Sequence, residues 1–160
     1  MGNNKMTQWG VGSKMVRGTF LTAVVIFTLQ FAVFPDFRMP LSFGQGVFLG
    51  CAWFCLGIFI WIDGAMKIKQ NFFRGNLVTS GVYRYIQHPI YSAFIFFYLP
   101  GIAIMTRSYL AIVLPCVFYF LYQRHIGVEE EWLHKTFGAR YDEYKKRTGR
   151  LVPNMRLFGS

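Results

Sequence analysis

The residues best suited to chemistry stand together at residues 76–91, whose sequence is NLVTSGVYRYIQHPIY. A turn, two tyrosines and a histidine precede Pro89, and the chain after Pro89 is apolar for about the width of a bilayer. Proline favours the first turn of a helix, so His88 is predicted to lie at a helix start, beside free backbone N–H groups and the positive end of the dipole. Such a place can hold an anion. The alternative is an ordinary interfacial loop, because tyrosine is common at membrane surfaces.

The acidic residues point to the same place. The chain has seven, and three of them are consecutive: Glu129, Glu130 and Glu131. If the two apolar segments between His88 and these glutamates form a hairpin, the chain returns to the level of His88. The helix start and His88 could then bind a carboxylate while the glutamates bind an ammonium group or hydroxyls, which together would suit a zwitterion. The alternative is that the glutamates only pair with basic neighbours such as Arg124 in an exposed helix.

Metal and nucleophile chemistry find little support in the sequence. Glu131 and His134 have the spacing of half a carboxylate di-iron site, but the pattern occurs once and the chain has three histidines. No serine or cysteine nucleophile arrangement, phosphate-binding loop or dinucleotide glycine motif is visible. We therefore predict no metal site, and we interpret Cys51, Cys55 and Cys116 as buried packing residues.

The composition is that of an integral membrane protein. Hydrophobic residues make up 54% and aromatic residues 19%, with apolar segments long enough to cross a bilayer. The net charge of +10 could suggest a nucleic-acid partner. The basic residues flank apolar segments instead of clustering on one face, so we expect lipid headgroups as their partner and no nucleic acid.

We expect an all-α fold, with residues 1–160 forming a single membrane domain. The predicted transmembrane helices, about four in number, are residues 16–34, 41–62, 89–106 and 109–122. Cytoplasmic segments at 75–91 and 124–153 would form the site, the second as an amphipathic helix broken near Gly138. Pro100 predicts a kink, and Pro115 lies in the middle of the fourth predicted span. Gly46 and Gly50 permit close helix contact, and the alternative is a membrane helix that simply tolerates glycine.

The distribution of positive charge predicts the orientation in the membrane. Fifteen of the 17 lysines and arginines fall on one side of these spans, which leaves only Arg38 and Arg107 for the other. By the positive-inside rule both termini are cytoplasmic, in the inner membrane if the cell is bacterial. The first residues are polar and no cleavage site follows the first span, so we expect no cleavable signal peptide.

Four motifs together resemble the isoprenylcysteine carboxyl methyltransferase family and the related phospholipid methyltransferases. They are the segment 76–85, the His88-Pro89-x-Tyr91 motif, the glutamate pair with the aromatic pattern that follows it, and Arg150-Leu151-Val152-Pro153. The resemblance covers about residues 75–153 in the same order as in the family. It implies a membrane methyltransferase that uses S-adenosylmethionine and modifies a lipid or prenylated acceptor.

The resemblance also implies the site residues. Gly81, Val82 and Tyr83 would surround the adenosine, with His88 and Tyr91 near the amino-acid moiety of the cofactor. Glu129 and Glu130 would bind the ribose or the ammonium group, and Tyr141, Arg150 and Leu151 would close over the pocket. The catalytic candidates are His88, Tyr91 and Glu130.

Departures from the family pattern keep the acceptor open. Relatives usually carry arginine directly before His-Pro, where this chain has Gln87, and Ala93 replaces a common glycine. A carboxylate acceptor needs no base, whereas an amine must lose a proton, for which His88 is a candidate. The alternatives are a phospholipid N-methyltransferase, an NADPH-dependent enzyme like the sterol reductases, and a non-catalytic membrane protein.

Overall fold

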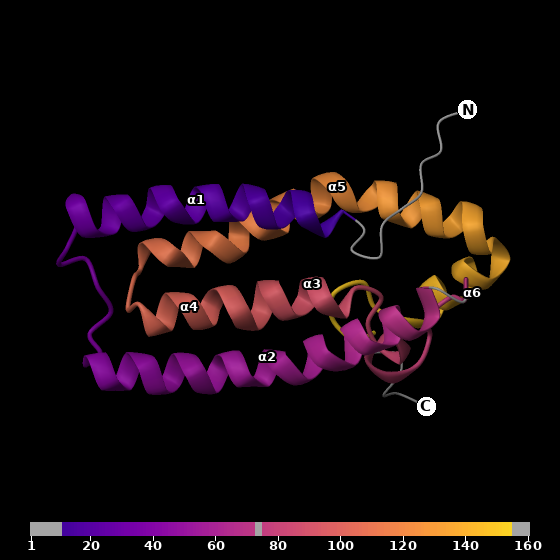
Figure 1. Ribbon diagram of the computed structural model, residues 1–160, viewed down its shortest axis with the longest axis horizontal. Helices are drawn as coiled ribbons and strands as arrows, with labels where there is room; N and C mark the ends of the chain where they lie inside the picture. The colour runs from indigo at the N-terminus through magenta and orange to yellow at the C-terminus, as the bar shows by residue number, and fades with distance from the viewer. Residues whose placement is uncertain (1–10, 73–74, 155–160) are drawn as a thin grey trace.

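The computed structural model describes residues 11–72 and 75–154, and its helices form an elongated bundle (Figure 1). Lys5, Arg74 and Arg156, which contribute to the predicted orientation, lie outside these residues. The described residues contain isolated bridges but no strand. The helices are α1 (Gly12–Ala32), α2 (Phe43–Phe72), η1 (Gly81–Arg84), α3 (Pro89–Ala93), η2 (Phe94–Tyr98), α4 (Leu99–Met105), η3 (Leu110–Ile112), α5 (Val113–Phe137) and α6 (Ala139–Arg147).

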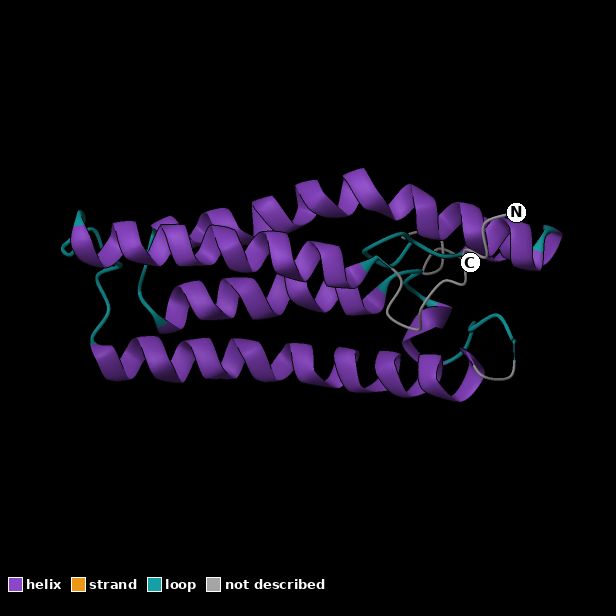
Figure 2. Ribbon diagram, turned by 45° about the horizontal axis from the view of Figure 1, so that its top comes forward, coloured by secondary structure: helices purple, strands orange, loops and turns teal. Residues whose placement is uncertain are grey.

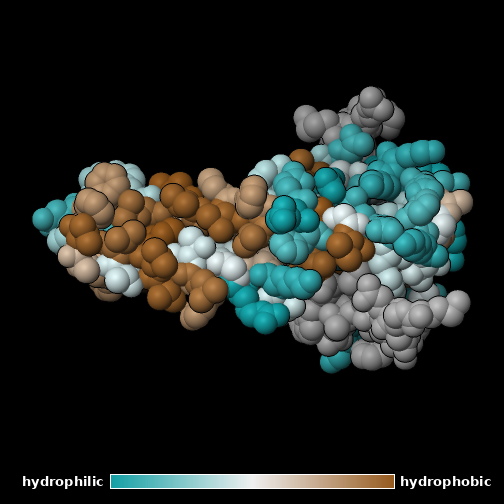
Figure 3. Space-filling view, turned by 90° about the horizontal axis from the view of Figure 1, so that it is seen from above, coloured by the Kyte–Doolittle hydropathy of each residue, from teal (hydrophilic) through white to brown (hydrophobic). Residues whose placement is uncertain are grey.

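The bundle has three layers. α3, η2 and α4 follow one another without a break and form a central rod, with α2 packed on one side and α1 and α5 on the other (Figures 1 and 2). The start of α1, the end of α2 and α6 lie at the same end of the bundle. The space-filling view shows that this end is polar, whereas the opposite half is largely hydrophobic (Figure 3). The bundle therefore has an apolar shaft and a polar head.

The all-α membrane fold predicted from the sequence is confirmed. Three helices, Gly12–Ala32, Phe43–Asn71 and Leu110–Phe137, are long and apolar enough to cross a membrane, and Pro89–Met105 is a shorter apolar helix. Large side chains on the shaft point outward, as Phe48 and Phe59 show with 73% and 75% of their surface exposed. Such a surface suits lipid and not water. The cysteines also lie on this surface, so the prediction that they are buried was wrong.

α2 packs closely against the central rod because it carries glycines where the two meet. A Cβ atom on Gly50 would lie 2.8 Å from the carbonyl oxygen of Gly101, and one on Gly46 would lie 3.1 Å from that of Ile104. Gly44, by contrast, has open space around its Cα. The glycines at 46 and 50 therefore serve helix contact.

The irregular stretch of the rod has an identifiable cause. Pro100 has no N–H to donate to the carbonyl group of Phe96 one turn earlier, and the helix is π-helical over Phe94–Tyr98. The indole N–H of Trp53 on α2 donates to that carbonyl at 2.8 Å. A neighbouring helix thus satisfies the backbone group that proline leaves free.

The last long helix differs from the prediction in two ways. Pro115 lies in the first turn of α5, where its missing N–H disrupts nothing, and not in the middle of a span. α5 then continues to Phe137 instead of ending at Tyr122 before a separate surface helix. The break comes at Gly138, whose φ of 54° favours glycine, and α6 follows. One rigid helix therefore connects the apolar shaft to the polar head.

A hydrogen-bonded cluster closes the end of the bundle opposite the polar head. Buried Gln30 donates from Nε2 to the carbonyl oxygens of Phe34 at 2.6 Å and Phe37 at 3.3 Å. Its Oε1 accepts from the Ser108 hydroxyl at 2.6 Å, and that hydroxyl accepts from the N–H of Ala111. Every polar atom of the Gln30 amide is used, which joins α1 to the turn before α5.

Candidate active site

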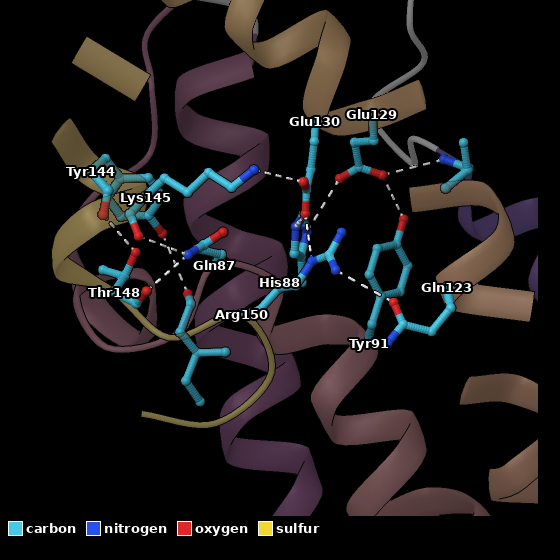
Figure 4. Close-up of polar contacts among 12 residues, drawn as sticks. Gln87, His88, Tyr91, Gln123, Glu129, Glu130, Tyr144, Lys145, Thr148 and Arg150 are labelled. Carbon is cyan, nitrogen blue, oxygen red and sulfur yellow. Dashed lines mark hydrogen bonds and ion pairs between the residues drawn. The ribbon is translucent and has the colours of Figure 1, made fainter. Parts of the chain in front are cut away.

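His88 lies at the centre of the polar head. It precedes α3, its side chain is 4% exposed, and its imidazole stands between two carboxylates (Figure 4). Nδ1 is 3.7 Å from Glu129 Oε1, and Nε2 is 3.5 Å from Glu130 Oε1. The histidine and the glutamate pair, 41 residues apart in sequence, therefore meet as predicted from the hairpin topology.

Glu129 connects three helices. Its Oε2 accepts the Tyr91 hydroxyl at 2.8 Å and the backbone N–H of Val11, directly before α1, at 3.4 Å. A Cβ on Gly12 would lie 3.4 Å from the Tyr91 ring, an ordinary van der Waals distance, so the start of α1 lies directly against this tyrosine. The start of α1 is thus part of the site, a contribution that no sequence motif indicated.

Glu130 has different partners. Arg150 Nε donates to it at 2.7 Å and Lys145 Nζ at 2.9 Å, so the carboxylate holds the C-terminal segment against α5. The guanidinium of Arg150 also lies over the Tyr122 ring, 5.7 Å from its centroid. Burial is the largest single influence and lowers the pKa of the Arg150 guanidinium, but the hydrogen bond to Glu130 and the electrostatic effects of Tyr122, Glu130 and Tyr141 together outweigh it and raise that pKa. The pairing with Lys145 was not predicted. Glu131 instead pairs with Lys135 as an exposed contact one turn along α5.

The loop before His88 is held by α2. Asp63 Oδ2 accepts the N–H of Val82 at 2.7 Å, and a Cβ on Gly81 would collide with the Asp63 carboxylate. Gly81 also has a φ of 63°, so the turn requires glycine twice over. Tyr83 follows, buried, with its carbonyl accepting the Tyr144 hydroxyl at 2.8 Å. Burial, with the nearby charge of Glu129, raises the pKa of Tyr83 well above its usual value, so its phenol stays protonated.

Residues 149–151 run alongside residues 86–88. Gln87 N–H donates to the Gly149 carbonyl at 2.8 Å and His88 N–H to the Arg150 carbonyl at 3.1 Å. The Ser92 hydroxyl donates to the Leu151 carbonyl at 2.6 Å. The C-terminal segment is therefore fastened by backbone contacts on one side and by the Glu130 ion pairs on the other.

A cavity of about 810 Å³ opens beside this cluster. Its described walls come from α1, α2, the loop after α2, the rod, α5 and α6. The lining residues are Gly12, Ser13, Val16, Arg17, Trp61, Ile68, Gly75, Asn76, Leu77, Val78, Tyr83, Gln87, His88, Ile90, Tyr91, Phe94, Phe118, Glu129, Trp132, Leu133, Thr136, Phe137, Tyr141 and Tyr144. It therefore extends from the polar head to the aromatic residues of the shaft.

The ten predicted cofactor residues divide evenly with respect to this cavity. Those that line it are Tyr83, His88, Tyr91, Glu129 and Tyr141. The others, which are not among the described lining residues, are Gly81, Val82, Glu130, Arg150 and Leu151. Their contacts hold the loop, the histidine and the C-terminal segment in place.

Buried polar atoms without a hydrogen-bond partner gather at this site. They include Gln87 Oε1, the hydroxyls of Tyr122 and Tyr141, and His88 Nε2, whose 3.5 Å contact with Glu130 is not a hydrogen bond. The described residues elsewhere hold two, Thr19 Oγ1 and Arg38 Nε. Burial, with the charges of Glu130 and Glu129, raises the pKa of Tyr141, so its hydroxyl keeps its proton and can donate. Native proteins rarely leave such groups unpaired, so their clustering favours a polar ligand here.

Comparison with known proteins places the chain in a family. Residues 39–140 match the model described as phospholipid methyltransferase. A protein-S-isoprenylcysteine O-methyltransferase of Schizosaccharomyces pombe is 26% identical over 130 residues, covering 75% of this chain and 55% of the relative. Its Arabidopsis thaliana counterpart B is 34% identical over 77 residues, covering 48% and 39%. A methanethiol S-methyltransferase of Pseudomonas deceptionensis is 32% identical over 84 residues, covering 51% and 30%.

The chain spans about half the length, or less, of the curated relatives it matches. The family match covers all of α2, the rod and α5, and α5 carries the glutamate pair. The resemblance to the isoprenylcysteine methyltransferases is confirmed, and the chain belongs to the phospholipid methyltransferase family.

Proposed function

We propose that this protein is an S-adenosylmethionine-dependent membrane methyltransferase that modifies a lipid or lipid-linked acceptor. The observation that carries the proposal is the double character of the cavity. His88, Glu129 and Tyr141 line its polar end, and Phe94 and Phe118 from the shaft line its apolar end. A polar cofactor and an apolar acceptor could each occupy the end that suits it.

The polar end fits the cofactor by its donor and acceptor set. S-adenosylmethionine, when bound, supplies a methyl group made electrophilic by the positive sulfonium. Glu129, oriented by Tyr91, can accept hydrogen bonds from an ammonium group or from ribose hydroxyls. The unpartnered hydroxyl of Tyr141 can donate to a carboxylate or a ring nitrogen. Methyl transfer is a displacement along one line, so this end serves to align the reactants and to exclude water.

The names of the relatives favour an oxygen acceptor on a prenylated cysteine. Such an acceptor is already ionised near neutral pH and needs no base. The family description keeps a phospholipid amine as the second candidate. An amine would have to lose a proton, and His88, which lines the cavity between two carboxylates, is the residue placed to accept it.

For the orientation we propose that the polar head faces the cytoplasm. Four described cations lie at this end of the bundle: Lys67 and Lys69 near the end of α2, and Lys145 and Arg150 beyond α5. The described cations of the opposite end are Arg38 and Arg107, which lie in the loops there. The positive-inside rule then places the site at the cytoplasmic surface.

The test is calorimetric titration of S-adenosylhomocysteine, and separately of NADPH, into purified protein in detergent. We expect the first to bind and the second not to bind. His88→Ala should abolish binding, while the control His134→Ala, on the exposed end of α5, should leave it unchanged. Binding of NADPH alone would move the chain to the reductase-like alternative. If neither ligand binds to the folded protein, a non-catalytic role would be favoured.

A further inference from the structure

Gln87 is more constrained than its place beside the His-Pro motif indicates. It is 93% buried, and its Nε2 donates to the carbonyl oxygens of Thr148 at 2.8 Å and Lys145 at 3.3 Å. These two carbonyls fix the orientation of the amide, because the opposite orientation would place Oε1 against two acceptors. Figure 4 shows the nitrogen turned toward these carbonyls and the oxygen turned the other way.

The amide oxygen has no hydrogen-bond partner among the residues that the structure describes. Oε1 is buried and without a hydrogen bond, and Gln87 is one of the residues that line the cavity. If Gln87 served only to fasten the end of α6, the two donors of the amide would suffice. A buried acceptor without a partner, in a residue that lines a cavity, is costly unless a molecule bound there donates to it.

The surroundings of Gln87 specify the kind of donor. The nearby cations Lys145 and Arg150 are both engaged by Glu130, and neither is among the described residues lining the cavity. Arg17 on α1 is the one permanent cation in the described lining. An anion placed against Gln87 would therefore meet an amide oxygen and no positive partner, whereas a neutral N–H group would be matched.

We propose that Gln87 is a specificity-determining residue whose side-chain oxygen accepts a hydrogen bond from a neutral N–H group of the molecule bound in the cavity. This inference rests on the proposed function, which offers two sources for that group. One is the exocyclic amino group of the cofactor's purine, and the other is an amide N–H on the methyl acceptor. Arginine, which has no acceptor, could not replace glutamine in this role.

The experiment separates the oxygen from the two donors of the amide. Gln87→Arg keeps N–H groups that can reach the Thr148 and Lys145 carbonyls but removes the acceptor. Calorimetry then compares S-adenosylhomocysteine with its analogue lacking the purine amino group, and N-acetyl-S-farnesylcysteine with its N-methyl derivative. In the natural protein we expect one of these pairs to differ about 3- to 10-fold in affinity, the effect of one buried hydrogen bond.

In Gln87→Arg the two ligands of that pair should bind with equal affinity, so that the ratio of their dissociation constants is about one. The pair whose ratio collapses identifies the source of the N–H group. Thr148→Val is the matched control, because it loosens the same end of α6 by removing the hydroxyl contact with the Tyr144 carbonyl and leaves the Gln87 oxygen in place. It should keep the ratio of the natural protein.

Ratios that are equal in the natural protein and in Gln87→Arg for both pairs would overturn the inference and leave Gln87 as a fastening residue. This outcome is distinct from failure of the proposed function. In that case the natural protein would not bind S-adenosylhomocysteine at all.

Discussion

Two buried glutamines, one at each end of the bundle, use the same side chain in opposite ways. Gln30, at the end opposite the polar head, donates from Nε2 to two carbonyls and accepts at Oε1 from Ser108. Gln87, in the head, also donates to two carbonyls, but within the described part of the chain its Oε1 has no partner, and the residue lines the cavity. The first amide is complete within the protein, and the second is incomplete.

The difference separates polar groups that stabilise the fold from polar groups prepared for a ligand. A fully paired amide between apolar helices contributes to stability because its loss leaves several partners unsatisfied. A buried amide oxygen without a partner lowers stability until a donor binds to it. Substitutions at the two ends should therefore affect different measurements.

After His88→Ala, which should abolish binding, the largest effect is expected at the head, from Glu129→Ala. It removes the carboxylate that Tyr91 orients and that faces the cavity, so S-adenosylhomocysteine affinity should fall roughly 100-fold, about 3 kcal/mol for a charged hydrogen-bonding group. Calorimetry measures the loss. Glu131→Ala, which removes only an exposed pair with Lys135, is the control and should bind normally. Equal affinity in the two variants would remove Glu129 from the site.

The next effect is expected at the opposite end, from Gln30→Leu. The substitution leaves two carbonyls and the Ser108 hydroxyl without their partner, at a cost of about 2 kcal/mol in the free energy of unfolding. Thermal unfolding in detergent should show the loss, while the ligand affinity of the folded protein stays unchanged. The control Thr28→Ala, on the exposed face of α1, should change neither the thermal unfolding nor the ligand affinity. A loss of affinity in Gln30→Leu would contradict the separation of the two ends.

Glu130→Gln should combine a smaller loss of stability with a loss of binding. It removes the charge that Lys145 and Arg150 share, and because both cations are nearly half exposed the pairs contribute about 1 kcal/mol. Hydrogen exchange of residues 139–152 should become faster, and the site should bind less tightly as the segment loosens. Asp142→Asn, which affects an exposed pair with His134, is the control. Unchanged exchange would mean that the backbone contacts of residues 149–151 suffice.

The smallest effect is expected from Trp53→Phe in the shaft. It removes the donor to the Phe96 carbonyl, at a cost of about 0.6 to 1 kcal/mol in a membrane helix pair. Thermal unfolding of the double variant with Pro100→Ala sharpens the test, because an alanine at position 100 supplies the missing N–H. The cost of Trp53→Phe should then shrink. An equal cost in both backgrounds would mean that Trp53 acts through packing alone.

The fold and the meeting of His88 with the glutamate pair could be predicted because they follow from patterns along the chain. Apolar length identifies helices in a membrane, and a hairpin returns Glu129 to the level of His88. The position of Pro115 within its helix was predicted wrongly because hydropathy does not show where a helix begins and ends. The predicted span was residues 109–122, whereas α5 is Val113–Phe137. The cysteines were predicted to be buried because an apolar segment in lipid does not reveal which side faces outward.

The rest of the site depends on contacts that leave no local signal. The Val11 N–H reaches Glu129 across 118 positions of sequence, and Lys145 reaches Glu130 from another helix. Asn76–Val78 lie in a motif that the sequence did indicate, and they line the cavity. The proposed role of Gln87 could not be predicted from the sequence, because it depends on which atoms of its side-chain amide already have hydrogen-bond partners within the protein.

The contact between Val11 and Glu129 has a consequence for how the protein is made. The site uses the start of α1, which is synthesised early, and a carboxylate that follows every apolar segment of the shaft. Arg150 and its neighbours, which fasten the histidine region, leave the ribosome later still. A chain that ends before residue 150 would therefore contain all the apolar helices of the shaft but lack the contacts that complete the site. In a cell-free synthesis, ligand binding should begin only when the C-terminal segment has been made and has packed into the head.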